Sequence, residues 1–455
     1  MNFSGIVFLY FFLPLFFGIY AISKPFMRAY VMLLGSCAVI AWESPLGLIP
    51  FSCSVLIAYL GGLGCKKLKN NKKAATALLT VCILPEIAVP ILVFVIGASE
   101  IGIMTTVGAG IYTLHSISYC CDVFRGECEA VTDPLRLAAY VSFLPSLDGI
   151  PLVEPKKTLE AMKEPKLNSE MLADGILLML FGTIEKVLIS DRLAMLFTEM
   201  QETSGGELSM IMSWLGAFFF GSAMLCRLKG YAHIAQGFAM MLGFDIGPSF
   251  DYPYSKSSLK DYLASYNISA YRFVQKNVYR PIAGSESNHA RTLTASTISI
   301  ITVCISYKPS IPFLLWGTGA ALLITIELLA DHQLSKIPRP VRYILTHSLT
   351  LIGWGIISQK TAVASFGYVS RMFTGALNLD AAPLLYFLSS AGPFVMLLLF
   401  FEAKTFITML KRVSARKVNP IMFIKPFLVF ALLVICTAFL LSGGQTASRW
   451  EVPIG

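Results

Sequence analysis

Five histidines are the side chains of this 455-residue sequence whose ordinary pKa lies closest to neutral pH, which makes them the first candidates for a general base. His115 and His347 lie inside apolar runs, where a satisfied polar contact or a hydrogen bond between helices is the simpler interpretation. His289 and His332 lie among polar loop residues, and we expect water to solvate both. His233 lies in the segment GYAHIAQG, and both a structural hydrogen bond and acid–base chemistry are open for it.

Charged and phenolic side chains form a second group of candidates. Four charged residues interrupt otherwise apolar stretches: Glu86, Glu185, Lys186 and Glu327. An ionised side chain at the centre of a bilayer costs about 2.5–3.5 kcal/mol or more, so such residues pair with a neighbour, lie at the interface or mark a functional site. Six tyrosines are expected to form either an aromatic belt at the membrane interface or part of a binding site: Tyr252, Tyr254, Tyr262, Tyr266, Tyr271 and Tyr279.

The composition places these candidates in a membrane protein. Only 14% of the residues are charged and the mean hydropathy is +0.68, whereas soluble domains carry about 25% charged residues. So little polar material cannot cover a water-exposed globule, which excludes a soluble enzyme, a disordered chain and a disulfide scaffold. The ten cysteines lie mostly in apolar runs without metal-ligand spacing, so we expect small buried hydrophobic residues and no metal site.

Uncharged runs of about 20 residues, the length that crosses a hydrocarbon core, recur along the whole chain. They predict an all-α polytopic membrane protein of one integral membrane domain, with about 10–12 transmembrane or re-entrant helices. The basic clusters Lys66–Lys73 and Lys411–Lys417 are expected on the cytoplasmic side, which puts the N- and C-termini outside. Two stretches, Asp122–Glu170 and Asp245–Arg291, are too polar for simple spans, and we expect the function there.

Seven motifs follow one another in these stretches and between them: Ser116–Gly126, Tyr140–Pro145, Gly182–Ala194, Gly230–Phe244, Asn267–Gly284, Phe313–Gly317 (FLLWG) and Trp354. In this order they resemble the membrane-bound O-acyltransferase (MBOAT) superfamily. The resemblance is closest to the bacterial branch that includes the alginate O-acetyltransferase membrane subunit and the teichoic acid D-alanyltransferase. It covers residues of about 100–360 as a family-like core, with N-terminal spans over 1–99 and C-terminal spans over 361–455.

The resemblance implies an MBOAT-like fold around a central tunnel and a multi-pass protein of the cell membrane. Members of this branch pass an acyl group from a cytoplasmic donor to a hydroxyl of an extracytoplasmic cell-surface polysaccharide. We therefore expect an acyl donor such as acetyl-CoA or an acyl-carrier protein, no tightly bound cofactor, and no nucleic acid. A secreted or membrane-anchored polysaccharide-modifying transferase is the expected protein partner, besides the lipid bilayer.

The resemblance also assigns a site. Asn267 and Tyr307 stand where the family has its two histidines. We expect the Asn267 amide to donate a hydrogen bond to the acyl carbonyl, and Tyr307 to act as the base with Lys308 lowering its pKa. His233 stands near the position of a family acid and is the alternative base. The expected substrate-binding residues are Lys308, Arg280, Tyr266, Tyr279 and Trp316, and Asn267, Tyr307 and Arg280 are predicted to border one cavity.

The two substituted histidine positions leave the activity open. A working O-acyltransferase is favoured because the neighbouring motifs are intact, and a catalytically degenerate pseudoenzyme that serves as a scaffold or acyl conduit is the alternative. A membrane transporter unrelated to acylation is a third hypothesis. Inverted repeats with paired Gly- or Pro-broken helices would indicate a transporter, and the sequence shows none.

Overall fold

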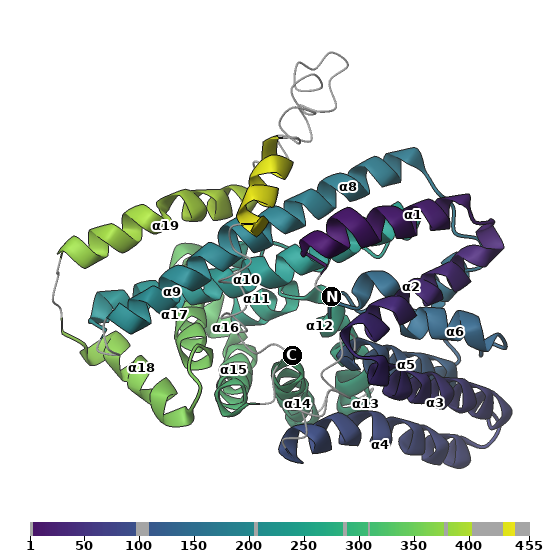
Figure 1. Ribbon diagram of the computed structural model, residues 1–455. Helices are drawn as coiled ribbons and strands as arrows, with labels where there is room; N and C mark the ends of the chain where they lie inside the picture. The colour runs from purple at the N-terminus through teal and green to yellow at the C-terminus, as the bar shows by residue number, and fades with distance from the viewer. Residues whose placement is uncertain are drawn as a thin grey trace. The chain divides into compact units, whose positions relative to one another are not determined.

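The computed structural model describes residues 3–96, 109–203, 208–284, 289–307, 310–376, 381–402 and 431–441. Every regular element in these ranges is a helix, in agreement with the predicted all-α fold (Figure 1). Five of the described helical segments are long and apolar enough to cross a membrane: Pro25–Glu43, Pro45–Lys67, Met210–Met241, Ile311–Leu329 and Ala382–Phe400. Three shorter described helices are also apolar: Phe8–Ile22, Ala290–Cys304 and Ala431–Leu441. The chain is thus a multi-pass membrane protein, while the total number of crossings stays a prediction.

The chain folds as two compact units, the first comprising Met1–Met179 with Tyr231–Gly247 and the second Leu180–Gly230 with Pro248–Gly455. The division into an N-terminal part, a core and a C-terminal part stays a prediction. The helices of the first unit are α1 (Leu13–Ile22), α2 (Arg28–Glu43), α3 (Leu48–Lys67), α4 (Lys72–Ile96), α5 (Ala109–Arg125), α6 (Pro134–Val141), α7 (Pro155–Ala161) and most of α8 (Ser169–Ile184).

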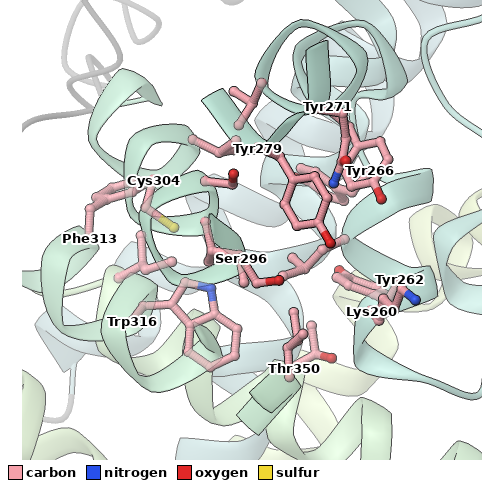
Figure 2. A pocket seen from close by; sticks show the side chains of 18 of the residues that line it. Lys260, Tyr262, Tyr266, Tyr271, Tyr279, Ser296, Cys304, Phe313, Trp316 and Thr350 are labelled. Carbon is pink, nitrogen blue, oxygen red and sulfur yellow. The ribbon is translucent and has the colours of Figure 1, made fainter. Parts of the chain in front are cut away.

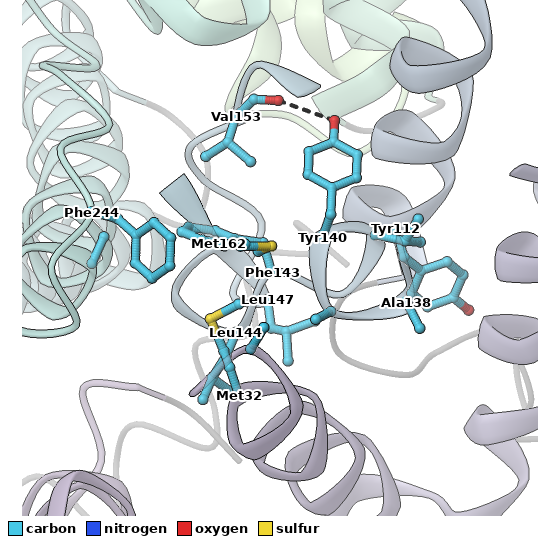
Figure 3. Packing of buried hydrophobic residues seen from close by; sticks show 14 of the residues in the cluster. Met32, Tyr112, Ala138, Tyr140, Phe143, Leu144, Leu147, Val153, Met162 and Phe244 are labelled. Carbon is cyan, nitrogen blue, oxygen red and sulfur yellow. Dashed lines mark hydrogen bonds between the residues drawn. The ribbon is translucent and has the colours of Figure 1, made fainter. Parts of the chain in front are cut away.

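The core of the first unit explains one of the sequence motifs. Tyr140 and Phe143, from the motif YVSFLP, are fully buried, and the ring of Phe143 meets Phe244 edge-on with centroids 5.5 Å apart. The Tyr140 hydroxyl donates a hydrogen bond of 3.3 Å to the Val153 carbonyl (Figure 3). This motif therefore contributes packing and not a reactive group.

A capping residue sets the start of the helix that carries this motif. Asp133 precedes α6, and its Oδ1 accepts hydrogen bonds from the backbone N–H groups of Leu135 (3.0 Å) and Arg136 (3.2 Å). The Tyr30 hydroxyl donates to Asp133 Oδ2 at 2.7 Å. Burial raises the pKa of this carboxyl, but the hydrogen bonds and the Arg136 charge together outweigh burial, so the pKa of Asp133 is lowered.

The second unit contains the remaining helices. They are the end of α8, α9 (Asp191–Thr203), most of α10 (Met210–Met241), α11 (Leu259–Ser265), α12 (Ile268–Val274), α13 (Arg280–Ala283), α14 (His289–Tyr307), α15 (Ile311–Leu329), α16 (Asp331–Leu334), α17 (Arg339–Ile357), α18 (Ala362–Thr374) and α19 (Ala381–Glu402). Two π-helical segments, Glu185–Ser190 and Gln275–Tyr279, interrupt this pattern. Such π turns are rare and occur often at functional sites.

Candidate functional site

The second unit contains a cavity of about 290 Å³ (Figure 2). Its walls come from α10, α11, α12, the π-helical segment Gln275–Tyr279, α14, α15 and α17. Most of the lining is aliphatic or aromatic. The lining side chains that carry an oxygen or a basic or amide nitrogen are Lys260, Tyr262, Tyr266, Tyr271, Gln275, Tyr279, Thr292, Ser296, Ser299 and Thr350.

Two short helices position the tyrosines of this cavity, and each begins at a capping side chain. Ser258 Oγ accepts a hydrogen bond from Asp261 N at 3.2 Å at the start of α11. Asn267 precedes α12 in the left-handed conformation, with φ +61°, and its Oδ1 accepts from Ala270 N at 3.2 Å. A left-handed residue is uncommon outside glycine, although asparagine is among the residues that tolerate it. The chain thus turns sharply between the two helices.

Backbone hydrogen bonds hold this turn against the segment that precedes it. Asp251 N donates to the Ser265 carbonyl at 3.1 Å, and Ile268 N donates to the Ser249 carbonyl at 2.7 Å. The arrangement fixes both ends of the connection between α11 and α12. The polar stretch after Asp245 is therefore ordered by its own main chain.

Close helix packing positions the two tryptophans of the cavity. A Cβ added at Gly353 of α17 would lie 2.6 Å from three ring carbons of Trp316 on α15, and one added at Gly221 of α10 would lie 2.6 Å from Trp354 Cγ. Only glycine leaves room for the two indoles at these positions. Small residues allow this kind of close approach between membrane helices.

The cavity can hold an apolar group and hydrogen-bond a polar one. Figure 2 shows Cys304, Phe313 and Trp316 on one side and Lys260 and Tyr262 on the other. Among the described residues that line the cavity, none is histidine, aspartate or glutamate. Phenols and serine or threonine hydroxyls can donate to a carbonyl oxygen, but a phenol of pKa about 10 is a weak base at neutral pH.

Comparison with known proteins decides the family. The family model described as MBOAT, membrane-bound O-acyltransferase family, matches residues 131–370, more than half of the chain. The chain belongs to the membrane-bound O-acyltransferase family. Every residue that lines the cavity lies within this match. The MBOAT resemblance inferred from the motifs is thus confirmed.

Curated relatives agree with this assignment. The chain is 24% identical over 395 residues to the probable alginate O-acetylase AlgI of Pseudomonas aeruginosa, and the alignment covers 82% of this chain and 75% of the relative. It is 26% identical over 383 residues to the AlgI of Pseudomonas fluorescens, with 82% and 76% covered. For the AlgI of Azotobacter vinelandii the identity is 24% over 396 residues, with 82% and 78% covered.

Three predicted substrate-binding residues of this MBOAT chain line the cavity: Tyr266, Tyr279 and Trp316. The ring of Tyr266 lies 5.8 Å from that of Trp354, which also lines the cavity. Tyr262 and Tyr271 line it too, whereas Tyr252 and Tyr254 do not. Of the six tyrosines singled out in the sequence, four therefore line the cavity and two do not.

Two other predicted residues lie next to this group without lining the cavity. Asn267 follows Tyr266 and is 6% exposed. Its Oδ1 accepts from Ser269 Oγ at 2.9 Å as well as from the backbone of α12. Arg280 follows Tyr279 at the start of α13 and is exposed. Neither Asn267 nor Arg280 is among the described residues that line this cavity. The predicted cavity that both would share with Tyr307, and the roles of the three residues, stay predictions.

The remaining predicted residues are placed only in part. Tyr307 is the last residue of α14, three positions after the lining residue Cys304, but its side chain is outside the described part of the structure. Lys308 lies outside the described residues, as do the cluster Lys411–Lys417 and the C-terminus. His233 is a half-buried residue of α10 in the first unit. The proposed catalytic roles of Tyr307 and His233 stay predictions.

Two further histidines have structural partners. His115 is fully buried: its Nδ1 donates to the Val141 carbonyl at 3.1 Å and its Nε2 accepts from Val153 N at 3.2 Å. His347 Nε2 donates to the Lys256 carbonyl at 3.1 Å. Lys256 directly follows the short 3₁₀ helix Pro253–Ser255, so this contact joins α17 to the polar stretch after Asp245.

The charged residues within apolar runs are paired. Lys229 of α10 lies 3.2 Å from Glu185 Oε1 and 2.6 Å from Glu402 Oε1, and all three side chains are at most 7% exposed. Lys186 pairs with Asp191 at 3.0 Å. Ser54 donates to Glu86 Oε2 at 2.7 Å, and Glu327 Oε2 accepts from Lys260 N at 3.0 Å. These contacts agree with the pairing interpretation of Glu185 and Lys186.

Several lining residues were not predicted, although their spacing is informative. Thr292, Ser296 and Ser299 lie on one face of α14, and Thr350, Trp354 and Ile357 lie on one face of α17. Both sets are separated by four and then three positions, the spacing of a single helix face. A polar face on an apolar helix is the signal that could have identified α14.

Proposed function

We propose that this chain transfers an acyl group from a cytoplasmic thioester donor to a hydroxyl of an extracytoplasmic cell-surface polysaccharide. The observation that carries the proposal is an apolar cavity with several hydroxyl side chains in its lining. All of its lining residues lie within residues 131–370, which match the family model. The relatives described as probable alginate O-acetylases support a polysaccharide acceptor. Acetyl-CoA or an acyl-carrier protein would be the donor, and a secreted or membrane-anchored transferase would complete the modification.

The proposed reaction needs a base for the acceptor hydroxyl and a hydrogen-bond donor for the oxyanion. The acceptor oxygen forms a bond to the acyl carbonyl carbon, the C–S bond of the thioester breaks, and the hydroxyl proton passes through a base to the leaving thiolate. Tyrosine hydroxyls at the cavity and the Asn267 amide are suited to stabilising the oxyanion. Tyr307 with Lys308, or His233, would take the proton. The proposed topology keeps Lys66–Lys73 on the donor side and both termini on the acceptor side.

A catalytically degenerate acyl conduit is the second candidate function. It is favoured by one observation, the absence of histidine and carboxylate side chains among the described lining residues. Such a protein would bind an acyl donor or product without performing the transfer.

An acyl-transfer assay in membranes tests the proposal. Membranes that contain the chain are given radiolabelled acetyl-CoA and a surface polysaccharide, and acetyl ester on the polymer is measured beside the polymer of a gene-deleted and a complemented strain. Base-labile acyl groups that disappear on deletion and return with the gene are the expected result. Unchanged acylation of the surface polymer in the deleted strain would overturn the proposal.

A further inference from the structure

We propose that the connection between α3 and α4 binds the headgroups of anionic phospholipids in preference to zwitterionic ones. Five lysines within eight residues form this surface, which we call the lysine turn: Lys66, Lys67, Lys69, Lys72 and Lys73. The first two end α3, the last two begin α4, and all five are exposed. The lysine turn belongs to the first unit, whereas the cavity lies in the second.

Hydrogen bonds fix the backbone of the lysine turn, so its charges are held close together. Leu68 N donates to the Gly64 carbonyl at 2.9 Å and closes α3. Asn71 N donates to the Leu68 carbonyl at 2.8 Å, and Asn71 Oδ1 accepts from Ala74 N at 3.2 Å at the start of α4. The two helices pack against each other (Figure 1). The lysines therefore cannot separate by unwinding the turn at no cost.

No acidic side chain in the described part of the chain pairs with the lysine turn. None of its five lysines forms an ion pair with another described residue. The sequence has no aspartate or glutamate between Glu43 and Glu86. Like charges at this spacing repel one another, and Lys72 and Lys73 lie in the first turn of α4, where the helix dipole disfavours cations. An anion from outside the chain would relieve both effects.

Another group of lysines in the first unit is compensated by neighbouring acids. Four lysines and three glutamates, all exposed, are interspersed over residues 154–166: Glu154, Lys156, Lys157, Glu160, Lys163, Glu164 and Lys166. We call this stretch the compensated segment. It balances most of its own charge, whereas the lysine turn combines five cations with no acid.

The position and the residue type favour a lipid surface over a small phosphate compound. Lys66 and Lys67 end the segment Pro45–Lys67, which is long and apolar enough to cross a membrane. Their ammonium groups can therefore reach the headgroups at the end of the apolar stretch. Lysine is a point charge on a flexible stem, whereas compact phosphate sites favour the planar fork of arginine or clustered backbone N–H groups. An all-lysine surface suits several mobile headgroups.

The test measures lipid binding without any reaction. The purified full-length chain in a neutral maltoside detergent is titrated with dioctanoyl-phosphatidylglycerol or with dioctanoyl-phosphatidylcholine, which carry the same acyl chains. Native mass spectrometry counts the bound lipid. Inorganic phosphate and coenzyme A are titrated in parallel, because both carry phosphate without a lipid tail.

Two matched variants localise the binding, and a third separates charge from residue type. The test variant removes four charges from the lysine turn: Lys66→Gln, Lys67→Gln, Lys72→Gln and Lys73→Gln. The control variant removes four charges from the compensated segment: Lys156→Gln, Lys157→Gln, Lys163→Gln and Lys166→Gln. The third variant carries arginine at the four positions of the test variant and so keeps their charge.

The parent should bind phosphatidylglycerol at least about tenfold more tightly than phosphatidylcholine at low salt, since each lysine near an anionic lipid surface contributes a factor of about five. The test variant should lose this preference. The control and arginine variants should keep it. High salt should weaken it in the parent, because salt screens exposed charges. If the test variant does not fold, the pair Lys66→Gln and Lys73→Gln carries the same prediction with a smaller loss.

Three results would overturn the inference. The first is equal binding of the two lipids by the parent. The second is the same loss of preference in the test and control variants, which would be an effect of net charge and not of the lysine turn. The third is binding of coenzyme A or inorganic phosphate that depends on the lysine turn and that phosphatidylglycerol does not displace, which would assign the surface to a soluble phosphate compound.

Discussion

Gly353 lies directly against the indole of Trp316, so that no side chain fits between α17 and α15 at this point. Gly353→Ala should therefore force the tryptophan or the helix to move, with a loss of roughly 1–3 kcal/mol, as in other overpacked cores. The measurement is the apparent melting temperature in detergent. Gly319→Ala is the matched control, because a Cβ at Gly319 of α15 meets nothing within 4 Å. Equal melting temperatures of the two variants would contradict the packing.

The buried ionic cluster gives a second prediction. Lys229→Met leaves Glu185 and Glu402 without their shared cation, and removal of one partner from a buried ion pair costs roughly 3–5 kcal/mol. Lys256→Met is the control, since its pair with Asp251 is partly exposed and is worth at most about 1 kcal/mol. Thermal unfolding should show a larger loss for Lys229→Met. Combining it with Glu185→Gln and Glu402→Gln should recover part of that loss, and no recovery would argue against a charge effect.

Asp133 makes stability depend on pH in one direction. Its pKa is lowered in the folded protein, so its contribution is complete above the unfolded carboxyl pKa of about 3.9 and is lost as pH falls through the folded value. Asp133→Asn keeps a capping oxygen but removes the charge. The parent should be the more stable protein at pH 7, and the difference should vanish in acid. A difference that persists unchanged at pH 3 would exclude the charge as its cause.

Asn267 allows a structural and a chemical role to be separated. Glycine adopts the left-handed backbone readily, and Asn→Gly at a helix cap costs only a few tenths of a kcal/mol. If the amide donates to the acyl oxyanion, Asn267→Gly should lower the transfer rate by about 10²–10³-fold with little change in melting temperature. A loss of activity that only parallels a loss of folded protein would leave Asn267 as a cap.

Substitutions at Tyr307 distinguish a working acyltransferase from a catalytically degenerate acyl conduit. Tyr307→Phe keeps the ring and removes the hydroxyl, so a protein that uses Tyr307 as its base should lose at least about 10²-fold in rate. His233→Ala tests the alternative base in the same membranes. Parent activity that survives both changes would reject this site assignment. An inactive parent that gains activity with Tyr307→His would establish the degenerate function.

Periodicity and motif order predicted the helical class and the family from sequence. Three of the residues expected to bind substrate also line the cavity, namely Tyr266, Tyr279 and Trp316, while their role stays a prediction. The residues that escaped prediction depend on how a helix is rotated, which hydropathy does not report. Ser296 and Ser299 line the cavity from α14, and neither of them was singled out in the sequence analysis. The sequence identified Asn267 only as a substitution at a family histidine position. Its left-handed backbone and its capping hydrogen bond to Ala270 N depend on the local turn, which the sequence did not predict.

Because the segment Gln275–Tyr279 is π-helical, the shape of the cavity wall depends on the number of residues in this turn as well as on their types. A π turn accommodates one residue more than an α-helical turn, and both ends of this segment line the cavity. Deletion of a single residue here would convert the π turn into a regular α-helical turn. Because the π turn absorbs the extra residue, the helices on either side would keep their faces, and Gln275 and Tyr279 would approach each other by one residue along the cavity wall. A one-residue gap at this turn would therefore reshape the cavity wall without a substitution at any lining residue, a change that substitution patterns alone would not reveal.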